Sequence, residues 1–293
     1  MLSDLFIALQ HLQTFAQNEI VTADSTKNKA LLWQISGKNL SKPSYIYGTI
    51  HVIEKKDFFM SQNIKQKFEE TDQLVLEIPM DMSLSQKIEM AQKIMLPNQK
   101  TIKDYTSKTD FECLQNYMTD TLQINPKKQQ RLIRLKPFFL MATLEIDKIK
   151  KTKSYEKVFA KMAKKQRKTV VGLETADFQL SIIDRYPYTL QAKMLIDGIK
   201  QSTNDQTLFE EMVAVYKSQD IEKLYQLIKK ESDTMPNFEQ YFLTERNLDW
   251  IPKIEKIIQH QPVFIAVGAG HLGGEQGMVN LLRQNGYTLT PIR

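Results

Sequence analysis

The sequence contains a single cysteine, Cys113, among its 293 residues. One cysteine excludes an internal disulfide framework and any zinc finger built on cysteine pairs. It does not define the compartment, because a lone thiol persists in both cytoplasm and periplasm. No run approaches 18 apolar residues, so the sequence predicts no membrane-spanning helix. A chain of this length can still bury a core that folds without disulfides or a structural metal.

Several familiar motifs are also missing from the sequence. It has no Walker loop, no dinucleotide fingerprint after a first strand, no Gly-x-Ser-x-Gly elbow and no His-Glu-x-x-His. The 40 basic residues exceed the 34 acidic ones by a formal charge of +6, which favours solubility. A charge this small does not by itself indicate a nucleic-acid partner. Any chemistry must therefore come from another arrangement of residues.

Residues 1–30 are expected to be a leader or a poorly ordered N-terminus. The apolar patch over residues 5–9 is short, Asp4 replaces a basic residue, and Gln10 interrupts the run. As written, the segment is a poor signal peptide. Two localisations stay open: periplasmic or exported if the segment is a truncated signal peptide, and cytoplasmic otherwise.

Apolar strands separated by helices predict an α/β fold with a central mixed β-sheet flanked by helices. Residues 83–166 are mostly helical, and we interpret them as an insertion or lid within a single domain over residues 31–293. The oligomeric state is not indicated. The predicted strands are 31–37 and 44–50, which form a hairpin, followed by 73–79, 169–174, 262–268 and 286–292.

Glycine is scarce, yet five of the ten glycines lie between Gly268 and Gly277. Two of only four histidines, His51 and His271, end a Gly-x-x-His motif that follows an apolar strand. The pair predicts a shared site. The alternative is that each histidine caps a turn or bonds a backbone carbonyl. Glycines in such motifs permit tight turns or a close approach of the backbone, and the structural turn glycines are predicted to be Gly48, Gly268 and Gly270.

Two carboxylates stand in similar places. Glu77 is the only charge in an apolar strand, and Glu174 ends another strand. A buried carboxylate is costly unless it is paired or bound to metal. Because ligands bind at the carboxyl ends of parallel strands, we expect both to converge with His51 and His271 on one edge. The alternative is that each glutamate caps a helix or pairs with a surface lysine.

Arg246 is expected on an apolar helix face. Phe242, Arg246 and Trp250 follow a four-residue spacing and so share that face. A buried guanidinium needs a carboxylate, a cluster of carbonyls or an anionic ligand. The alternative to a catalytic role is a structural salt bridge to Glu77 or Glu174.

The run from Lys148 to Lys168 holds ten basic residues and one acid, Glu156. Apolar residues at helical spacing within it predict an amphipathic helix with a basic outer face. A second interpretation is peripheral contact with an anionic membrane surface.

The ordered motifs resemble those of the TraB/GumN family, which is related to the Tiki proteases. The resemblance extends over residues 31–293, although the segment 83–166 carries no motif. The motifs are Leu31-Leu-Trp-Gln-Ile, Tyr47-Gly-Thr-Ile-His-Val52, Leu74-Val-Leu-Glu77, Val171-Gly-Leu-Glu174-Thr, Glu245-Arg-Asn-Leu-Asp-Trp250, Val267-Gly-Ala-Gly-His-Leu272 and Leu281-Leu-Arg-Gln-Asn-Gly-Tyr287.

The resemblance implies a mixed α/β fold with paired Gly-x-x-His elements and a helical insertion. The animal relatives are regarded as metal-dependent peptidases, and the bacterial members include proteins that shut down peptide pheromone signalling. Distant fold relatives include erythromycin-esterase-like hydrolases and a haem-binding lipoprotein group. Many members are exported. The sequence departs from the family at Glu245, where the family usually has aspartate.

The resemblance implies that His51 and His271 correspond to the two histidines of the family motifs. We expect these two and Glu174 to bind a divalent ion, with zinc, manganese and cobalt about equally suited to such ligands. The expected activity is metal-dependent hydrolysis of peptide bonds.

The catalytic residues expected from the resemblance are Glu77, Arg246 and Asn247. Glu77 is expected to complete the coordination or to act as general base, and Arg246 to stabilise an oxyanion or hold a substrate carboxylate. Two other functions stay open. One is a binding protein that holds a peptide or small ligand without turnover. The other is a metal-free, esterase-like hydrolase with a histidine as general base.

Overall fold

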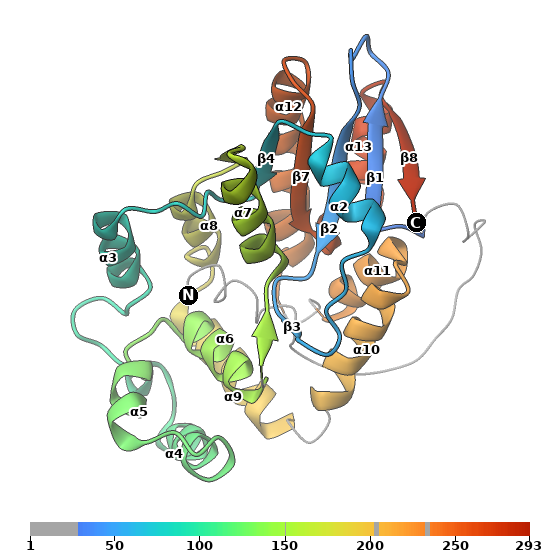
Figure 1. The fold of residues 1–293 in the computed structure, drawn as a ribbon. Helices are drawn as coiled ribbons and strands as arrows, with labels where there is room; N and C mark the ends of the chain where they lie inside the picture. The colour runs from blue at the N-terminus through green and yellow to red at the C-terminus, as the bar shows by residue number, and fades with distance from the viewer. Residues whose placement is uncertain (1–28, 150, 202–204, 232–234) are drawn as a thin grey trace. The chain divides into compact units, whose positions relative to one another are not determined.

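The computed structural model describes residues 29–149, 151–201, 205–231 and 235–293 (Figure 1). The leader expected over residues 1–30 falls outside this description except for its last two residues, of which Lys29 forms an isolated β-bridge with Asp220. The chain divides into two compact units. The helical unit contains Asp81–Thr152 and Ala176–Phe209, and the sheet unit contains 29–80, Lys153–Thr175 and Glu210–Arg293.

A six-stranded mixed sheet forms the centre of the sheet unit, so the predicted fold class is confirmed. Four neighbouring strands, β6, β4, β7 and β2, run parallel to one another. At one edge of the sheet, β1 is antiparallel both to β2 and to the last strand, β8. In spatial order the strands are β6 (Thr169–Gly172), β4 (Gln73–Leu76), β7 (Val263–Gly268), β2 (Ser44–Thr49), β1 (Leu32–Ser36) and β8 (Thr288–Ile292).

The predicted hairpin is confirmed: β1 pairs with β2, with Leu32 opposite Tyr47 and Trp33 opposite Ile46. At the end of β1 the chain turns through Gly37, whose φ of +91° is accessible mainly to glycine. The central strands β2, β4 and β7 are buried along their whole length. That burial explains their nearly continuous apolar sequences, which are typical of parallel strands covered on both faces.

Helices flank this sheet (Figure 1), and large aromatic side chains fill the contact between them. Phe68 and Phe159 stack on each other, and both contact Phe264 of β7. The helices of the unit are α2 (Gln62–Glu69), α7 (Tyr155–Gln166), the part of α10 (Asp205–Lys217) from residue 210 onward, α11 (Ile221–Glu231), α12 (Glu245–Ile258) and α13 (Met278–Gln284). The unit also contains the short strand β3 (Ile53–Glu54) and a π-helical stretch, Glu239–Thr244, that leads into α12.

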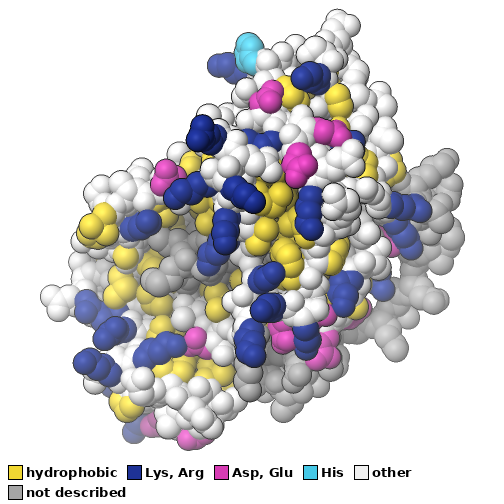
Figure 2. Space-filling model, in the orientation of Figure 1, with side chains coloured by type: hydrophobic (Ala, Val, Ile, Leu, Met, Phe, Trp, Pro, Cys, Tyr) yellow, Lys and Arg dark blue, Asp and Glu magenta, His cyan; other side chains and the backbone are white. Residues whose placement is uncertain are grey.

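Most of the basic run, Tyr155–Gln166, forms α7, which is amphipathic as predicted. Tyr155, Phe159 and Ala163 are buried, whereas most lysines of the helix are exposed. Figure 2 shows Lys and Arg side chains spread over the face on which α7 lies. The single acid of the run, Glu156, is buried with the apolar residues, which is the opposite of a solvated position.

The helical unit is built around α6, whose residues Phe138 and Phe139 are fully buried. The expectation of a single domain with an insertion over residues 83–166 stays a prediction. The helices are α3 (Leu84–Lys93), α4 (Lys108–Asn116), α5 (Pro126–Leu132), α6 (Pro137–Lys148), α8 (Ala176–Ile183) and α9 (Tyr188–Gln201). A 3-10 turn at Ile102–Tyr105 and a π-helical stretch at Tyr117–Thr121 join them, and the strand β5 (Thr152–Lys153) lies where the chain leaves this unit.

Within the described part of the chain, no helix combines the length and apolar character needed to cross a bilayer.

Gly48 gives the first test of this packing. A Cβ on Gly48 would lie 2.7 Å from a methyl of Leu272 and 3.0 Å from the backbone of Ala269. We expect Gly48→Ala to lower the free energy of unfolding by about 1–3 kcal/mol, because backbone atoms cannot move aside as a side chain can. Urea unfolding measures the change, with the exposed substitution Lys256→Ala as control. Equal stability of the two variants would contradict the close approach.

Candidate functional site

Four predicted residues lie at one edge of the sheet, where the parallel strands end. Thr49 ends β2 two residues before His51, Glu77 follows β4, Glu174 follows β6, and His271 lies in the turn after β7. The register of β4 with β6 and β7 brings these carboxyl ends to the same edge. All four side chains belong to the sheet unit.

The guanidinium of Arg246 is the centre of this cluster. Nη2 donates to Glu77 Oε2 at 2.5 Å and to Glu174 Oε1 at 2.6 Å. Nε donates to both oxygens of Glu174 at 3.1 and 3.2 Å. Nη1 donates to the carbonyl of Phe242 and to His271 Nε2, each at 3.0 Å. A guanidinium has five N–H groups, so every one of them is directed at a protein acceptor.

Helix α12 places this guanidinium with its neighbour Trp250, one turn further on. The indole Nε1 donates to Glu174 Oε2 at 3.0 Å. The guanidinium carbon lies 4.8 Å from the centre of the indole ring, and the ring of His271 lies 4.4 Å from it. The predicted apolar face of Arg246 and Trp250 is therefore the face that meets the sheet edge. The salt bridge from Arg246 to Glu77 and Glu174, one of the two alternatives from sequence, is present.

His271 is neutral and has a defined tautomer. The amide nitrogen of Asn247 donates to the carbonyls of His271 and Gln276, so its oxygen faces His271 Nδ1, 2.7 Å away. Nδ1 therefore carries the proton, and Nε2 accepts from Arg246. Burial and the charge of Arg246 lower the pKa of His271 to about 3. Asn247 thus holds this histidine and the turn around it.

His51, unlike His271, is protonated at neutral pH. Its Nδ1 lies 2.8 Å from Glu156 Oε1, and a carboxylate only accepts, so Nδ1 donates. Burial opposes the charge, and so does the nearby Arg246, but the carboxylates of Glu156 and Glu77 outweigh them and raise the pKa of His51 to about 9. Glu156 also accepts from Thr49 at 2.5 Å and from Ser154 at 2.7 Å. His51 is thus held at one nitrogen by a buried, hydrogen-bonded carboxylate.

Glu77 lies between the two histidines. Its Oε1 accepts from the backbone N–H of Gly268 at 2.7 Å and lies 3.7 Å from His51 Nε2 and 3.9 Å from His271 Nε2. Burial would raise the pKa of Glu77, but the charges of Arg246 and His51 and the hydrogen bond from the Gly268 N–H hold it well below its usual range. Glu77 is therefore an ionised carboxylate at neutral pH.

The predicted turn glycines lie beside these groups. A Cβ on Gly268 would lie 3.2 Å from His51 Nε2 and 3.3 Å from Glu77 Oε1, so the glycine keeps a small space open between them. Gly48 packs against Ala269 as described above, and Gly270 lies buried in the 3-10 turn Ala269–His271. None of the three has a positive φ. Gly48 and Gly268 thus allow a close approach of neighbouring groups and do not provide a left-handed backbone conformation.

The predicted metal ligands do not fit a divalent ion in this arrangement. In the described ranges, no group of three or more His, Cys, Asp or Glu side chains is placed to hold a metal. His271 Nε2 and Glu174 both face the guanidinium of Arg246. Of the three residues predicted as ligands, only His51 keeps a ring nitrogen without a hydrogen bond, and its nearest carboxylate oxygen there is that of Glu77.

Glu156 is a site residue that the sequence did not reveal. It lies 105 residues from His51, inside a basic run that predicts a solvated face. The one available signal was its position as the only acid of that run, next to Tyr155, which heads the apolar stripe. A lone carboxylate beside the buried face of a helix needs a partner.

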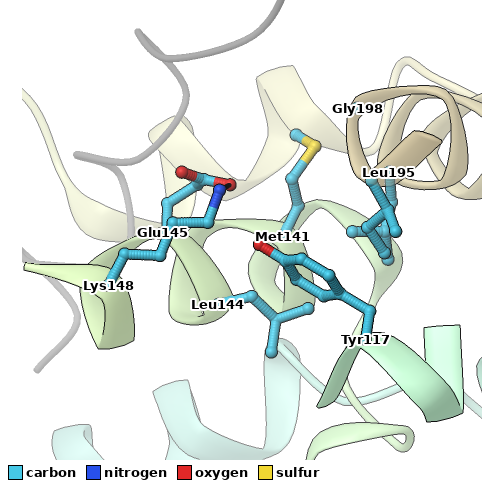
Figure 3. A pocket seen from close by; sticks show the side chains of 8 residues that line it. Tyr117, Met141, Leu144, Glu145, Lys148, Leu195 and Gly198 are labelled. Atoms are coloured by element: carbon cyan, nitrogen blue, oxygen red, sulfur yellow. Dashed lines mark hydrogen bonds and ion pairs between the residues drawn. The ribbon is translucent and has the colours of Figure 1, made fainter. Parts of the chain in front are cut away.

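A cavity in the helical unit offers no comparable site (Figure 3). It is lined by Tyr117, Met141 and Leu195, with the ion pair of Lys148 and Glu145 at 2.8 Å on its border. Its volume is about 10 Å³, which holds about one water molecule. The chemistry-bearing residues described above lie elsewhere, at the sheet edge.

These features define an α/β protein with a buried carboxylate, histidine and arginine cluster at the carboxyl edge of its sheet. The chain belongs to the TraB/PrgY/gumN family, whose family model matches residues 31–291. It is 24% identical over 318 aligned residues to Metalloprotease TIKI1 of Danio rerio, covering 88% of this chain. The chain spans 62% of the length of that relative. No solved structure matches the chain significantly.

The pairing of His51 with Glu156 has a spectroscopic test. We expect NMR titration to give His51 a pKa of about 9, and Glu156→Gln to lower it by roughly one unit or more, because the neutral amide no longer stabilises the imidazolium. His51→Gln assigns the resonance by removing it. An unchanged pKa in Glu156→Gln would contradict the pairing.

Proposed function

We propose that this protein is a hydrolase that cleaves peptide bonds, with His51 as the group that moves the proton. The observation that carries the proposal is the orientation of His51: Glu156 holds Nδ1, and Nε2 faces the space beside Gly268 and Glu77. A histidine held at one nitrogen by a carboxylate, with its other nitrogen available, is the arrangement of a general base. The family and the metalloprotease relative support hydrolysis of peptide bonds.

In the proposed reaction, a water molecule bridges His51 Nε2 and Glu77 Oε1 from the side, in the space beside Gly268. Neutral His51 takes a proton from this water as its oxygen attacks the scissile carbonyl. The resulting imidazolium then gives the proton to the leaving nitrogen as the carbon–nitrogen bond breaks. Glu77 orients the water and offsets the positive charge that develops on His51.

Arg246 and Asn247 act through other residues in this proposal. The five N–H groups of Arg246 are taken by protein acceptors. Binding an oxyanion or a substrate carboxylate would require one of those hydrogen bonds to break. We therefore assign Arg246 the task of fixing Glu77, and Asn247 the task of fixing the His271 turn.

Metal-dependent hydrolysis is the second candidate function, and the name of the relative, a metalloprotease, favours it. In a metal-dependent enzyme, His51, His271 and Glu174 would be the ligands of the metal ion. Comparing hydrolysis before and after chelation distinguishes the two forms. A protein that binds peptides and releases them intact would be the non-catalytic alternative.

Substitution of His51 tests the proposal directly. A mixture of unrelated peptides is incubated with the protein, and cleavage is followed by mass spectrometry. We expect His51→Gln to reduce cleavage roughly 10²- to 10⁴-fold, and the exposed His260→Gln to leave it unchanged. Equal loss in both variants, or peptides recovered intact with the unsubstituted protein, would exclude His51 as the base of a hydrolase.

The pH dependence gives a separate prediction. Because His51 is a base only when neutral, kcat/KM should rise about tenfold per pH unit below a pKa of about 9 and level off above it. In Glu156→Gln the midpoint should move to lower pH, since the carboxylate that raises the pKa is gone. The plateau should also fall, because the ring is no longer held. A midpoint that stays in place would remove Glu156 from the proposal.

A further inference from the structure

We infer that the guanidinium of Arg246 occupies the place that a divalent cation would take in this cluster, and that the protein holds no metal there. The catalytic consequence rests on the proposed function, but the binding claim does not. The inference begins with the groups around the guanidinium. They are Glu77 Oε2, Glu174 Oε1 and His271 Nε2, at 2.5, 2.6 and 3.0 Å from its nitrogens. Carboxylate oxygens and a neutral imidazole nitrogen are the donors that zinc, manganese and cobalt prefer.

An ion and the guanidinium cannot use these donors together. The lone pair of His271 Nε2 accepts from Nη1, so it cannot coordinate an ion while that hydrogen bond exists. An ion bound to Glu77 or Glu174 would also lie within a few ångströms of a permanent positive charge. Repulsion between such charges is large in a site with little water. Arg246 is 7% exposed, so solvent does not screen it effectively.

Arg246 is also anchored on sides that face no carboxylate. Nη1 donates to the carbonyl of Phe242, one turn earlier on the chain. The indole of Trp250 lies against the guanidinium and donates its own N–H to Glu174. Moving the guanidinium aside for an ion would break these contacts and leave a buried charge without its partners, which is strongly unfavourable.

The donors outside this shell are too few to form a site of their own. His51 Nε2 and Glu77 Oε1 are 3.7 Å apart. The next histidine, His271, has its Nε2 3.9 Å from Glu77 Oε1, but that nitrogen already accepts from Arg246. Structural zinc sites take four protein ligands and catalytic ones usually three. The sequence predicted a divalent ion bound by His51, His271 and Glu174. In the structure, the positive charge that Glu174 and His271 meet is the guanidinium of Arg246.

The inference has a consequence for substitution of Arg246. Methionine replaces the aliphatic part of the arginine side chain but is shorter and has neither charge nor side-chain N–H groups. Arg246→Met therefore leaves Glu77, Glu174 and His271 facing an empty position. In that variant a divalent ion can restore the missing charge. Lysine keeps a positive charge at the end of a chain of similar length, so Arg246→Lys is the matched control in which no such position opens.

The experiment measures metal binding without any substrate. Each protein is stripped with chelator, dialysed, and titrated with zinc, manganese or cobalt by calorimetry, and its thermal unfolding is recorded with and without the ion. We expect the unsubstituted protein to bind less than 0.1 equivalent and to unfold at the same temperature under both conditions. Arg246→Met should unfold at lower temperature without metal, bind about one equivalent, and recover several degrees with metal.

Two further variants make the result specific. Adding His271→Gln to Arg246→Met should abolish the metal binding gained by that variant, because it removes one donor. Adding the exposed His260→Gln should preserve this metal binding. Arg246→Lys should bind no metal. If Arg246→Met does not fold, the unsubstituted protein still decides the matter.

Two results would overturn the inference. One is stoichiometric binding of a metal by the unsubstituted protein that is lost in His51→Gln or His271→Gln. The other is an equal response to metal in Arg246→Met and Arg246→Lys. Failure of the proposed function looks different: no peptide is cleaved, whatever the metal measurements show.

Discussion

The buried guanidinium of Arg246 is the interaction on which the rest of the site depends. It joins α12 to the ends of β4 and β6 and to the turn after β7 through Glu77, Glu174 and His271. Two carboxylates in so little solvent would be unfavourable without this charge. The guanidinium therefore stabilises the fold and sets the charge of the site at once. Its planar fork matters as much as its charge, since three acceptors from three different segments are met at fixed angles.

The two Gly-x-x-His motifs look alike in sequence, but their surroundings give them opposite chemistry. His271 lies against the guanidinium and is neutral, with a pKa lowered to about 3. His51 lies against Glu156, and its pKa is raised to about 9. One histidine is thus an acceptor that helps to hold a cation, and the other is a group that exchanges a proton near neutral to alkaline pH. Similar motifs at equivalent strand ends do not have equivalent roles, because the nearest charge decides the protonation of each ring.

The sequence predicted the parts of the structure that depend on local pattern. Continuous apolar runs identified β2, β4 and β7, and parallel pairing of such strands brings Glu77, Glu174 and His271 to one edge. The four-residue spacing in α12 identified the buried face of Arg246, and one of its two predicted interpretations, a salt bridge, is what the structure contains. Glu156 escaped prediction because its partner lies 105 residues away. No local pattern records such a contact, and the lysines around Glu156 indicate a solvated surface.

A cation supplied by the chain differs physically from a bound metal. A guanidinium is always present and charged, so the cluster requires neither metal uptake nor the deprotonation of ligands that metal binding imposes. It cannot, however, lower the pKa of a bound water as zinc does. In the proposed function a side-chain base therefore activates the water, and His51 is the histidine of the cluster whose Nε2 has no hydrogen-bond partner. The buried carboxylate of Glu156 follows from the same requirement. Glu156 raises the pKa of His51, so the proposed base is strong, but it stays protonated until the solution becomes alkaline. In the proposed function, the geometry of Arg246 and the pairing of His51 with Glu156 are thus two parts of one way to activate water without a metal.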